Sequence, residues 1–186
     1  MAEPEYSAAA FNSVVRSIRE LASADSLRET LAALPADTRE LVDHPPLAIA
    51  WISYRHSFAL VRAAHDHAFE RDDARTMQVA QRSVIRDMAT IHRMFIRLAT
   101  VEYVVGRAAK LWDSYWRNNG SVTLERVDAR RLVVRYQGVQ HATRLFWIMQ
   151  CGVMRGLAEA TGMKDAAVTI EEGHVHPSRC AILISW

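Results

Sequence analysis

The sequence predicts one α+β domain, with helices over the first two-thirds of the chain and a four-stranded antiparallel sheet packed on helices after them. Apolar residues recur every three to four positions up to about residue 116, a spacing typical of helices. Beyond that point apolar and polar residues alternate in two regions, as in strands, and one further helical stretch separates them. A chain of 186 residues, half of them hydrophobic, suits a single core. The predicted domain therefore covers residues 1–186.

Three short helices are expected before the break at Pro45-Pro46. The apolar face of the first is formed by Phe11, Val14, Val15, Ile18 and Leu21. The second opens at the capping-box pattern Ser26-Leu-Arg-Glu29 and runs through Leu34, because Pro35 ends it. One or two further turns are expected over residues 37–42.

Three longer helices are expected next. The first runs from Leu47 to about Phe69 and is followed by a polar turn over residues 70–73. The second has the clearest helical stripe of the chain, formed by Val84, Met88, Ile91, Phe95 and Leu98. The third runs from Val101 to about Trp116 and stops at Asn118-Asn-Gly120, a strong terminator.

The last third predicts a hairpin, a helix and a second hairpin. The first hairpin joins residues 121–127 to residues 131–136, and the second joins residues 167–171 to residues 180–186. A long apolar helix is expected between them, from His141 to about Thr161. This order favours an antiparallel sheet with helices segregated to one side, which is α+β, over alternating βαβ units.

Charge and targeting signals point to a cytoplasmic protein without a nucleic-acid partner. Acidic residues (21) nearly balance basic ones (23), which gives a net charge of +2. The acidic N-terminus lacks the pattern of a signal peptide, and the two cysteines, Cys151 and Cys180, need no oxidising compartment. The richest apolar window, residues 145–157, is interrupted by polar residues and is shorter than the roughly twenty residues of a membrane span.

The stretch from Val122 to Trp186 resembles a known superfamily. It carries two strands ending in Leu132-Val-Val-Arg-Tyr136, a helix with Gly152-Val-Met-Arg-Gly156, and a last strand that begins at Cys180. This arrangement is similar to 4-vinyl-reductase domains, haem-NO-binding domains and palmitate-binding subunits of vesicle-tethering complexes. Within that superfamily the chain looks most like an uncharacterised family abundant in myxobacteria. The resemblance implies an apolar cavity between helices and sheet that holds a small hydrophobic ligand.

Two departures from these relatives bear on cofactors. Haem-NO-binding domains carry a Tyr-x-Ser-x-Arg motif, whereas this chain reads Tyr136-Gln-Gly138-Val-Gln140, and residues 99–116 contain no histidine to serve as their axial ligand. The 4-vinyl-reductase domains place a cysteine eight residues before the position of Cys180, where this chain has Glu172. The sequence therefore argues against haem bound in the family's mode, and we expect no cofactor.

Gly152 and Gly156 lie one turn apart on one face of the long apolar helix. A glycine inside a helix costs about 1 kcal/mol relative to alanine, so two of them indicate a packing demand rather than tolerance. We assign both a structural role, in which the helix approaches the sheet or a neighbouring helix closely.

Aromatic residues and one cysteine form the candidate ligand site. The expected set is Trp112, Tyr115, Trp116, Tyr136, Trp147 and Cys151. Aromatic side chains at helical spacing line a hydrophobic pocket, form a partner-binding patch or simply fill a core, and the sequence leaves these alternatives open. Cys151 lies in apolar company, which raises the pKa of a thiol and leaves it unreactive.

A candidate metal site lies on the last hairpin. His174 and His176 point to one face of an extended segment, and Cys180 follows, so the three side chains suit zinc. The alternative is a solvated turn beside a buried Cys180. Elsewhere, His92 neighbours apolar residues of the clearest helix and is either a cavity-facing histidine or a satisfied boundary residue.

Three functions follow from these features. The leading hypothesis is a non-enzymatic sensory or adaptor domain that binds a small apolar ligand and forms a homodimer, because no nucleophile, paired carboxylate or phosphate loop has motif spacing. The second is a protein-interaction scaffold that uses an exposed apolar face of the N-terminal helices. The third is a metal-dependent sensor or hydrolase built on the last hairpin.

Overall fold

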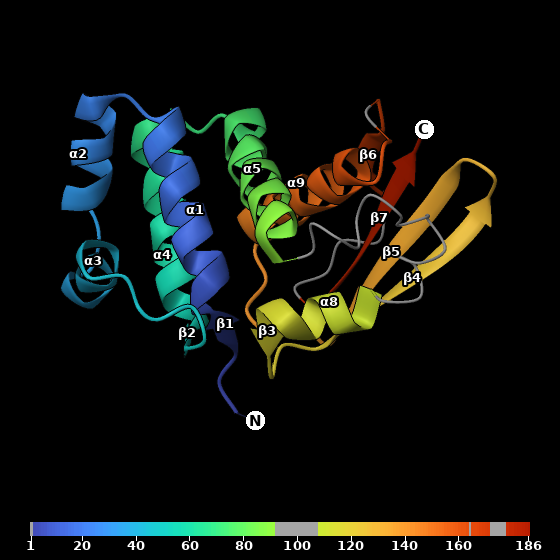
Figure 1. Cartoon of the computed structure of the whole chain (residues 1–186), viewed down its shortest axis with the longest axis horizontal. Helices are drawn as coiled ribbons and strands as arrows, with labels where there is room; N and C mark the ends of the chain where they lie inside the picture. The colour runs from blue at the N-terminus through green and yellow to red at the C-terminus, as the bar shows by residue number, and fades with distance from the viewer. Residues whose placement is uncertain (1, 92–107, 164, 172–177) are drawn as a thin grey trace.

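The helices gather on one side of the molecule and the larger sheet on the other (Figure 1). The structure, a computed structural model, describes residues 2–91, 108–163, 165–171 and 178–186. It confirms the predicted α+β class. No helix in these ranges is long and apolar enough to cross a membrane.

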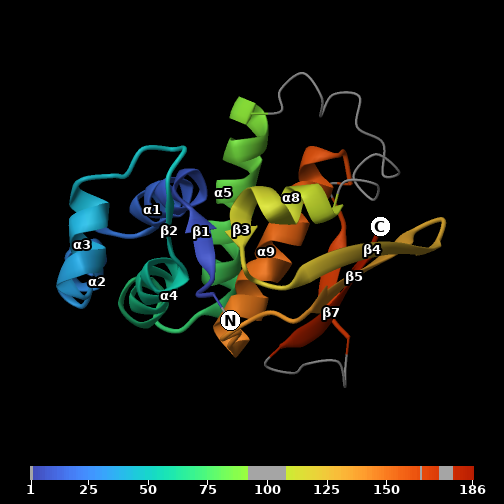
Figure 2. The same ribbon diagram turned by 90° about the horizontal axis from the view of Figure 1, so that it is seen from below.

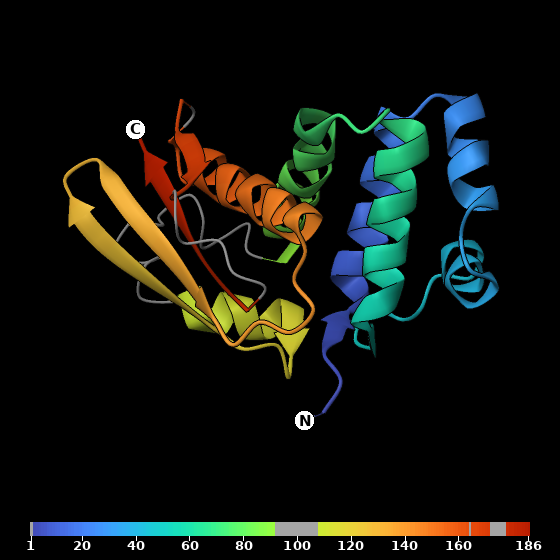
Figure 3. The same cartoon turned by 180° about the vertical axis from the view of Figure 1, so that it is seen from behind.

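The N-terminal helices are α1 (Ala8–Leu21), α2 (Ala24–Ala32), α3 (Ala36–Asp43) and α4 (Tyr54–Ala63), and α4 continues into the π-helix η1 (Ala64–Ala68). α1 and α4 run side by side, with α2 and α3 outside them (Figures 1 and 3). Their apolar faces meet in a mainly aliphatic core whose most buried members include Phe11, Ile18, Val42, Leu60 and Phe69.

The N-cap of α2 lies three residues before the predicted one. Ser23 is the N-cap, and its side-chain oxygen accepts a hydrogen bond from the backbone N–H of Ser26. Ser26 therefore lies inside the helix, where its hydroxyl bonds to the Ser23 carbonyl oxygen instead of capping the helix.

The predicted helix from Leu47 is wrong over its first turns. Residues 51–53 form a short strand, β2 (Trp51–Ser53), and α4 begins only after Ser53, whose hydroxyl caps it. β2 pairs with β1 (Glu5–Ser7), which pairs on its other side with β3 (Trp116–Arg117). Since all three strands are two or three residues long and distant in sequence, their pairing leaves no periodic pattern to recognise.

α5 (Asp73–Ile91) lies between the N-terminal helices and the rest of the molecule (Figure 1). Val84 and Met88 of its predicted stripe are buried, whereas Phe95 and Leu98 lie outside the described residues. The described end of the next predicted helix is α8 (Ala108–Tyr115), which stops one residue early because Trp116 enters β3.

The C-terminal third consists of β4 (Ser121–Asp128), β5 (Arg131–Gln137), α9 (Arg144–Ala160), β6 (Ala167–Ile170) and β7 (Arg179–Ser185). The strands form one antiparallel sheet in the order β4-β5-β7-β6, so the two predicted hairpins join through their second strands. α9 and α8 lie on the same side of this sheet (Figure 2). Both the four-stranded sheet and its helix are confirmed.

The two glycines of α9 face α5 rather than the sheet. A Cβ added at Gly152 would lie 2.8 Å from the Cβ of Ala80 and closer still to the Met77 carbonyl oxygen. A Cβ added at Gly156 would lie 2.8 Å from the carbonyl oxygen of Gln81. The prediction left open whether the glycines approach the sheet or a neighbouring helix, and the structure shows that they approach a helix. α9 crosses α5 there with the two backbones close together (Figure 3).

Candidate ligand cavity

An apolar cavity of about 130 Å³ lies where α5, α8 and α9 meet the inner face of the sheet. Its walls are mostly aliphatic, thioether and aromatic, as shown by Val84, Met88, Leu132, Val134, Phe146 and Met154. Pockets for drug-sized ligands usually measure roughly 300–1,000 Å³, so a ligand of that size requires wall side chains to move. Several methionines line the cavity, and their unbranched side chains adapt readily to such changes.

Stacked rings form one wall of the cavity. The Trp112 and Trp116 centroids lie 5.7 Å apart, and Trp112 lies 5.5 Å from Tyr136. Phe146 of α9 meets Trp116 edge-on at 5.7 Å, and Tyr6 of β1 meets it at 4.6 Å. The small sheet β2-β1-β3 therefore positions part of this wall, because it holds Tyr6 and Trp116 on paired strands.

Four of the six predicted ligand residues line the cavity: Trp112, Tyr115, Trp116 and Tyr136. The other two, Trp147 and Cys151, belong to the core behind the wall. Both lie on the part of α9 turned toward Tyr136, whose ring centroid is 5.5 Å from that of Trp147. Burial raises the pKa of the Cys151 thiol to about 12, as the sequence predicted in direction.

The cavity also has a buried carboxyl group, Asp87 of α5. It accepts hydrogen bonds from the Ser13 hydroxyl and, at 3.2 Å, from the Tyr115 hydroxyl. Burial raises the pKa of Asp87, and these hydrogen bonds and Arg86 offset part of that rise. Burial and the nearby carboxyl also raise the pKa of Tyr115, so this hydroxyl stays a hydrogen-bond donor.

A second buried polar pair sits at the sheet side of the cavity. The Tyr136 hydroxyl donates to the side-chain oxygen of Gln150, 3.4 Å away on α9. Burial holds the pKa of Tyr136 well above its ordinary value. The tyrosine that the chain shares with the haem-NO-binding motif therefore binds a protein amide in this structure.

One side of the cavity is closed by the loop that precedes α9. His141 has a positive φ of 56° and its ring stacks on Tyr54 of α4 with centroids 5.1 Å apart. The preceding residue, Gln140, is held in place by a hydrogen bond of 2.9 Å from its backbone N–H to the side-chain oxygen of Asn119. Tyr54, Asn119, Gln140 and His141 all line the cavity, so polar groups gather at this side.

The predicted metal residues are not brought together in the described chain. Cys180 is buried on β7, and burial raises the pKa of its thiol to about 11. His174 and His176 lie outside the described residues, as does His92. Within the described ranges no three histidine, cysteine or carboxylate side chains are close enough to share an ion. The metal site stays a prediction.

Sequence reasoning missed Asp87, Tyr6 and Phe146. Asp87 falls between Val84 and Met88 on the buried side of α5, and a carboxylate in an apolar stripe was the available signal. Tyr6 carried no signal, because its contribution depends on the pairing of β1 with β3. The large exposed hydrophobics of the described residues are Leu47, Ile49 and Val127, none of them on a helix, so the N-terminal helices show no such apolar face.

Known proteins share this fold. The sequence matches no protein-family model and no curated protein. Among solved structures, a Tt H-NOX variant matches with a TM-score of 0.71 at 11% identity, over 97% of this chain and 94% of that one. H-NOX proteins from K. algicida and S. oneidensis match with TM-scores of 0.67 and 0.65, at 8% and 13% identity, over 96% of this chain and 95% of each of theirs. The chain has the H-NOX fold, and the resemblance stated from the sequence is confirmed.

The expectation about cofactors is contradicted by these neighbours. Two are H-NOX proteins in Fe(II) states, and another, with a TM-score of 0.65 at 11% identity over 94% of this chain and 97% of that one, is a protein in which porphyrin distortion modulates heme redox potential. These solved neighbours are heme proteins, so the exclusion of heme drawn from the sequence was wrong. The exclusion rested on a few motif positions, and at 8–13% identity such positions need not correspond between this chain and its neighbours.

Proposed function

We propose that this chain is a non-enzymatic sensory or adaptor domain that binds a small, largely apolar ligand in the aromatic cavity. The observation that carries the proposal is the cavity itself, an apolar space between α5, α8, α9 and the sheet with polar groups confined to a few places on its wall. Ligand sites in proteins are typically such spaces, with few and convergent polar groups. The H-NOX fold of the chain supports the sensory role.

Haem is one ligand that these walls suit. Trp112, Tyr136 and Phe146 present ring faces and edges that would contact a macrocycle, and His141 supplies an imidazole on the wall. When bound, haem supplies an iron centre for small diatomic ligands. The aromatic and aliphatic residues of the wall would exclude water from it. Entry of so large a ring requires the methionines of the wall to move.

Binding to the purified chain tests the proposal. Hemin is titrated by its absorbance, and the neutral dye N-phenyl-1-naphthylamine by its fluorescence. Val153 lines the cavity, so Val153→Phe would fill it and is expected to weaken binding of both probes at least about tenfold, since a misplaced bulky group costs over 1 kcal/mol.

The matched control is Val127→Phe, the same change at an exposed position of the first hairpin. This variant should bind both probes as the unmodified chain does. Failure of both probes to bind the unmodified chain, or equal binding by both variants, would overturn the cavity as the ligand site. Binding of the dye without hemin would retain the pocket and remove haem as its occupant.

A further inference from the structure

A groove of about 330 Å³ on the face of α1 and α5 is rich in arginine. Arg16 and Arg19 of α1 are exposed beside it, and Arg86 of α5 forms part of its wall. Pro45, in the loop between α3 and β2, closes one side. Arg16 and Arg19 place two exposed positive charges at one groove in a protein whose net charge is only +2.

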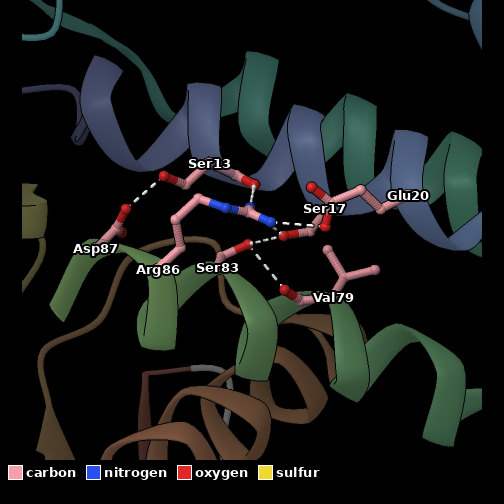
Figure 4. Close-up of polar contacts among 7 residues, drawn as sticks. All are labelled: Ser13, Ser17, Glu20, Val79, Ser83, Arg86 and Asp87. Atoms are coloured by element: carbon pink, nitrogen blue, oxygen red, sulfur yellow. Dashed lines mark hydrogen bonds and ion pairs between the residues drawn. The ribbon is translucent and has the colours of Figure 1, made fainter. Parts of the chain in front are cut away.

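Arg86 is held in place by α1. Its guanidinium donates to the Ser17 hydroxyl at 3.0 Å and to the Ser13 carbonyl oxygen at 3.3 Å, and it pairs with Glu20 at 2.6 Å (Figure 4). Ser83 adds a further bond to Ser17 from the same helix (Figure 4). The Arg86 cation is therefore fixed and already paired with Glu20, so the exposed cations of the groove are Arg16 and Arg19.

An unsatisfied acceptor lies in the same groove. The Asn12 amide donates to the Pro46 carbonyl oxygen at 3.0 Å, which fixes its orientation, and its side-chain oxygen is buried without a hydrogen-bond partner. A buried acceptor left unpaired is costly, so the site favours a ligand that brings an N–H donor. A bare phosphate or carboxylate brings none, whereas a peptide backbone brings one at nearly every residue.

The loop beside the groove adds apolar surface. Leu47 and Ile49 follow Pro45 in the loop and are 74% and 87% exposed. They are two of the three large hydrophobic side chains that stand out most among the described residues. Arginine next to exposed aliphatic side chains suits a partner that carries both carboxylates and apolar residues.

We propose that this groove docks an acidic, partly apolar peptide segment of a partner protein. Carboxylates of the segment pair with Arg16 and Arg19, a backbone N–H donates to Asn12, and apolar side chains cover Leu47 and Ile49. The proposal does not rest on the ligand cavity, since the residues it uses belong to α1 and to the loop after α3, and none of them lines that cavity.

The test is fluorescence anisotropy with the full chain and a short labelled peptide of glutamate and leucine. The double variant Arg16→Glu/Arg19→Glu should lose at least about tenfold in affinity, because like charges then face the peptide. The control Arg28→Glu/Arg62→Glu changes net charge equally at exposed arginines of α2 and α4, away from the groove, and should change the affinity less than about twofold.

A second variant separates the groove from charge alone. Asn12→Leu keeps every arginine and removes the acceptor. It should lower the affinity for the peptide by about three- to tenfold, which corresponds to the loss of one hydrogen bond. The proposal is overturned if the peptide does not bind, if both double variants weaken it equally, or if single-stranded DNA of the same charge binds more tightly and responds to the groove variants.

Discussion

The two hydrophobic cores of this molecule differ in composition and in filling. The N-terminal core is mainly aliphatic and packs α1 against α4 and its neighbours. The C-terminal core contains Trp112, Tyr136 and Trp147, and it borders the cavity. The cavity lies mainly against the aromatic core, although Val14 and Val61 of the N-terminal core also line it. The two cores therefore differ in how much of the cavity wall each supplies.

Removal of the same side chain from each core gives the sharpest contrast. Leu60 and Leu132 are both almost completely buried, but only Leu132 lines the cavity. Leu60→Ala should cost about 3–5 kcal/mol and Leu132→Ala about 2–3 kcal/mol, because a residue beside empty space has fewer contacts to lose. Urea unfolding of both variants measures the difference. Equal losses would mean that the two cores are packed alike.

Gly152→Ala tests the contact that joins the two regions. Helix propensity alone would stabilise this variant by about 1 kcal/mol, but the new methyl group meets the backbone of α5, and we expect a net loss of about 2 kcal/mol. The measurement is again the free energy of unfolding.

Gly162→Ala serves as the reference for that variant. Its added Cβ meets nothing within 4 Å, so only the positive φ of 92° opposes it, at about 1 kcal/mol. If Gly152→Ala is no less stable than this reference, α5 and α9 can separate without cost.

The thiols of the C-terminal core should make stability depend on alkaline pH. The folded pKa of Cys151, about 12, lies above its ordinary value of 9, so the native state retains a proton that the unfolded chain releases. This stabilisation is complete below pH 9 and is lost as the pH rises toward 12. Between pH 9 and 10 the unfolding free energy should fall by about 1 kcal/mol for this thiol. Cys151→Ala should show a smaller fall, and an identical profile would contradict the assignment.

The smallest effect is expected at the exposed ion pair between α5 and α9. Arg144 pairs with Asp73, and this partner raises the pKa of the guanidinium, yet the arginine side chain is 75% exposed. Arg144→Ala should therefore cost less than about 1 kcal/mol, and the cost should shrink in high salt. A larger, salt-independent loss in thermal unfolding would show that this pair, rather than the glycine contact, holds α9 on α5.

Sequence patterns predicted the periodic part of the fold and most of one cavity wall. The four-stranded sheet and α9 followed from alternation and helical spacing, and Tyr136 followed from the resemblance to the haem-NO-binding motif. The small sheet could not be predicted, because β1, β2 and β3 contact one another only through tertiary structure. Trp147 and Cys151 lie on α9 together with residues that line the cavity. Which α9 side chains reach the cavity depends on how the helix is rotated about its axis, and the sequence does not give that rotation. Asp87 could have been predicted, because it is a charged residue within an apolar helical stripe.

The close crossing of α5 and α9 has a consequence for how the domain would respond to an occupant. With no side chain at Gly152 or Gly156, α9 packs directly on the backbone of α5, which leaves the two helices little room to shift against each other. An occupant larger than the cavity would therefore displace α8 or the stacked pair Tyr54 and His141, rather than separate α5 from α9.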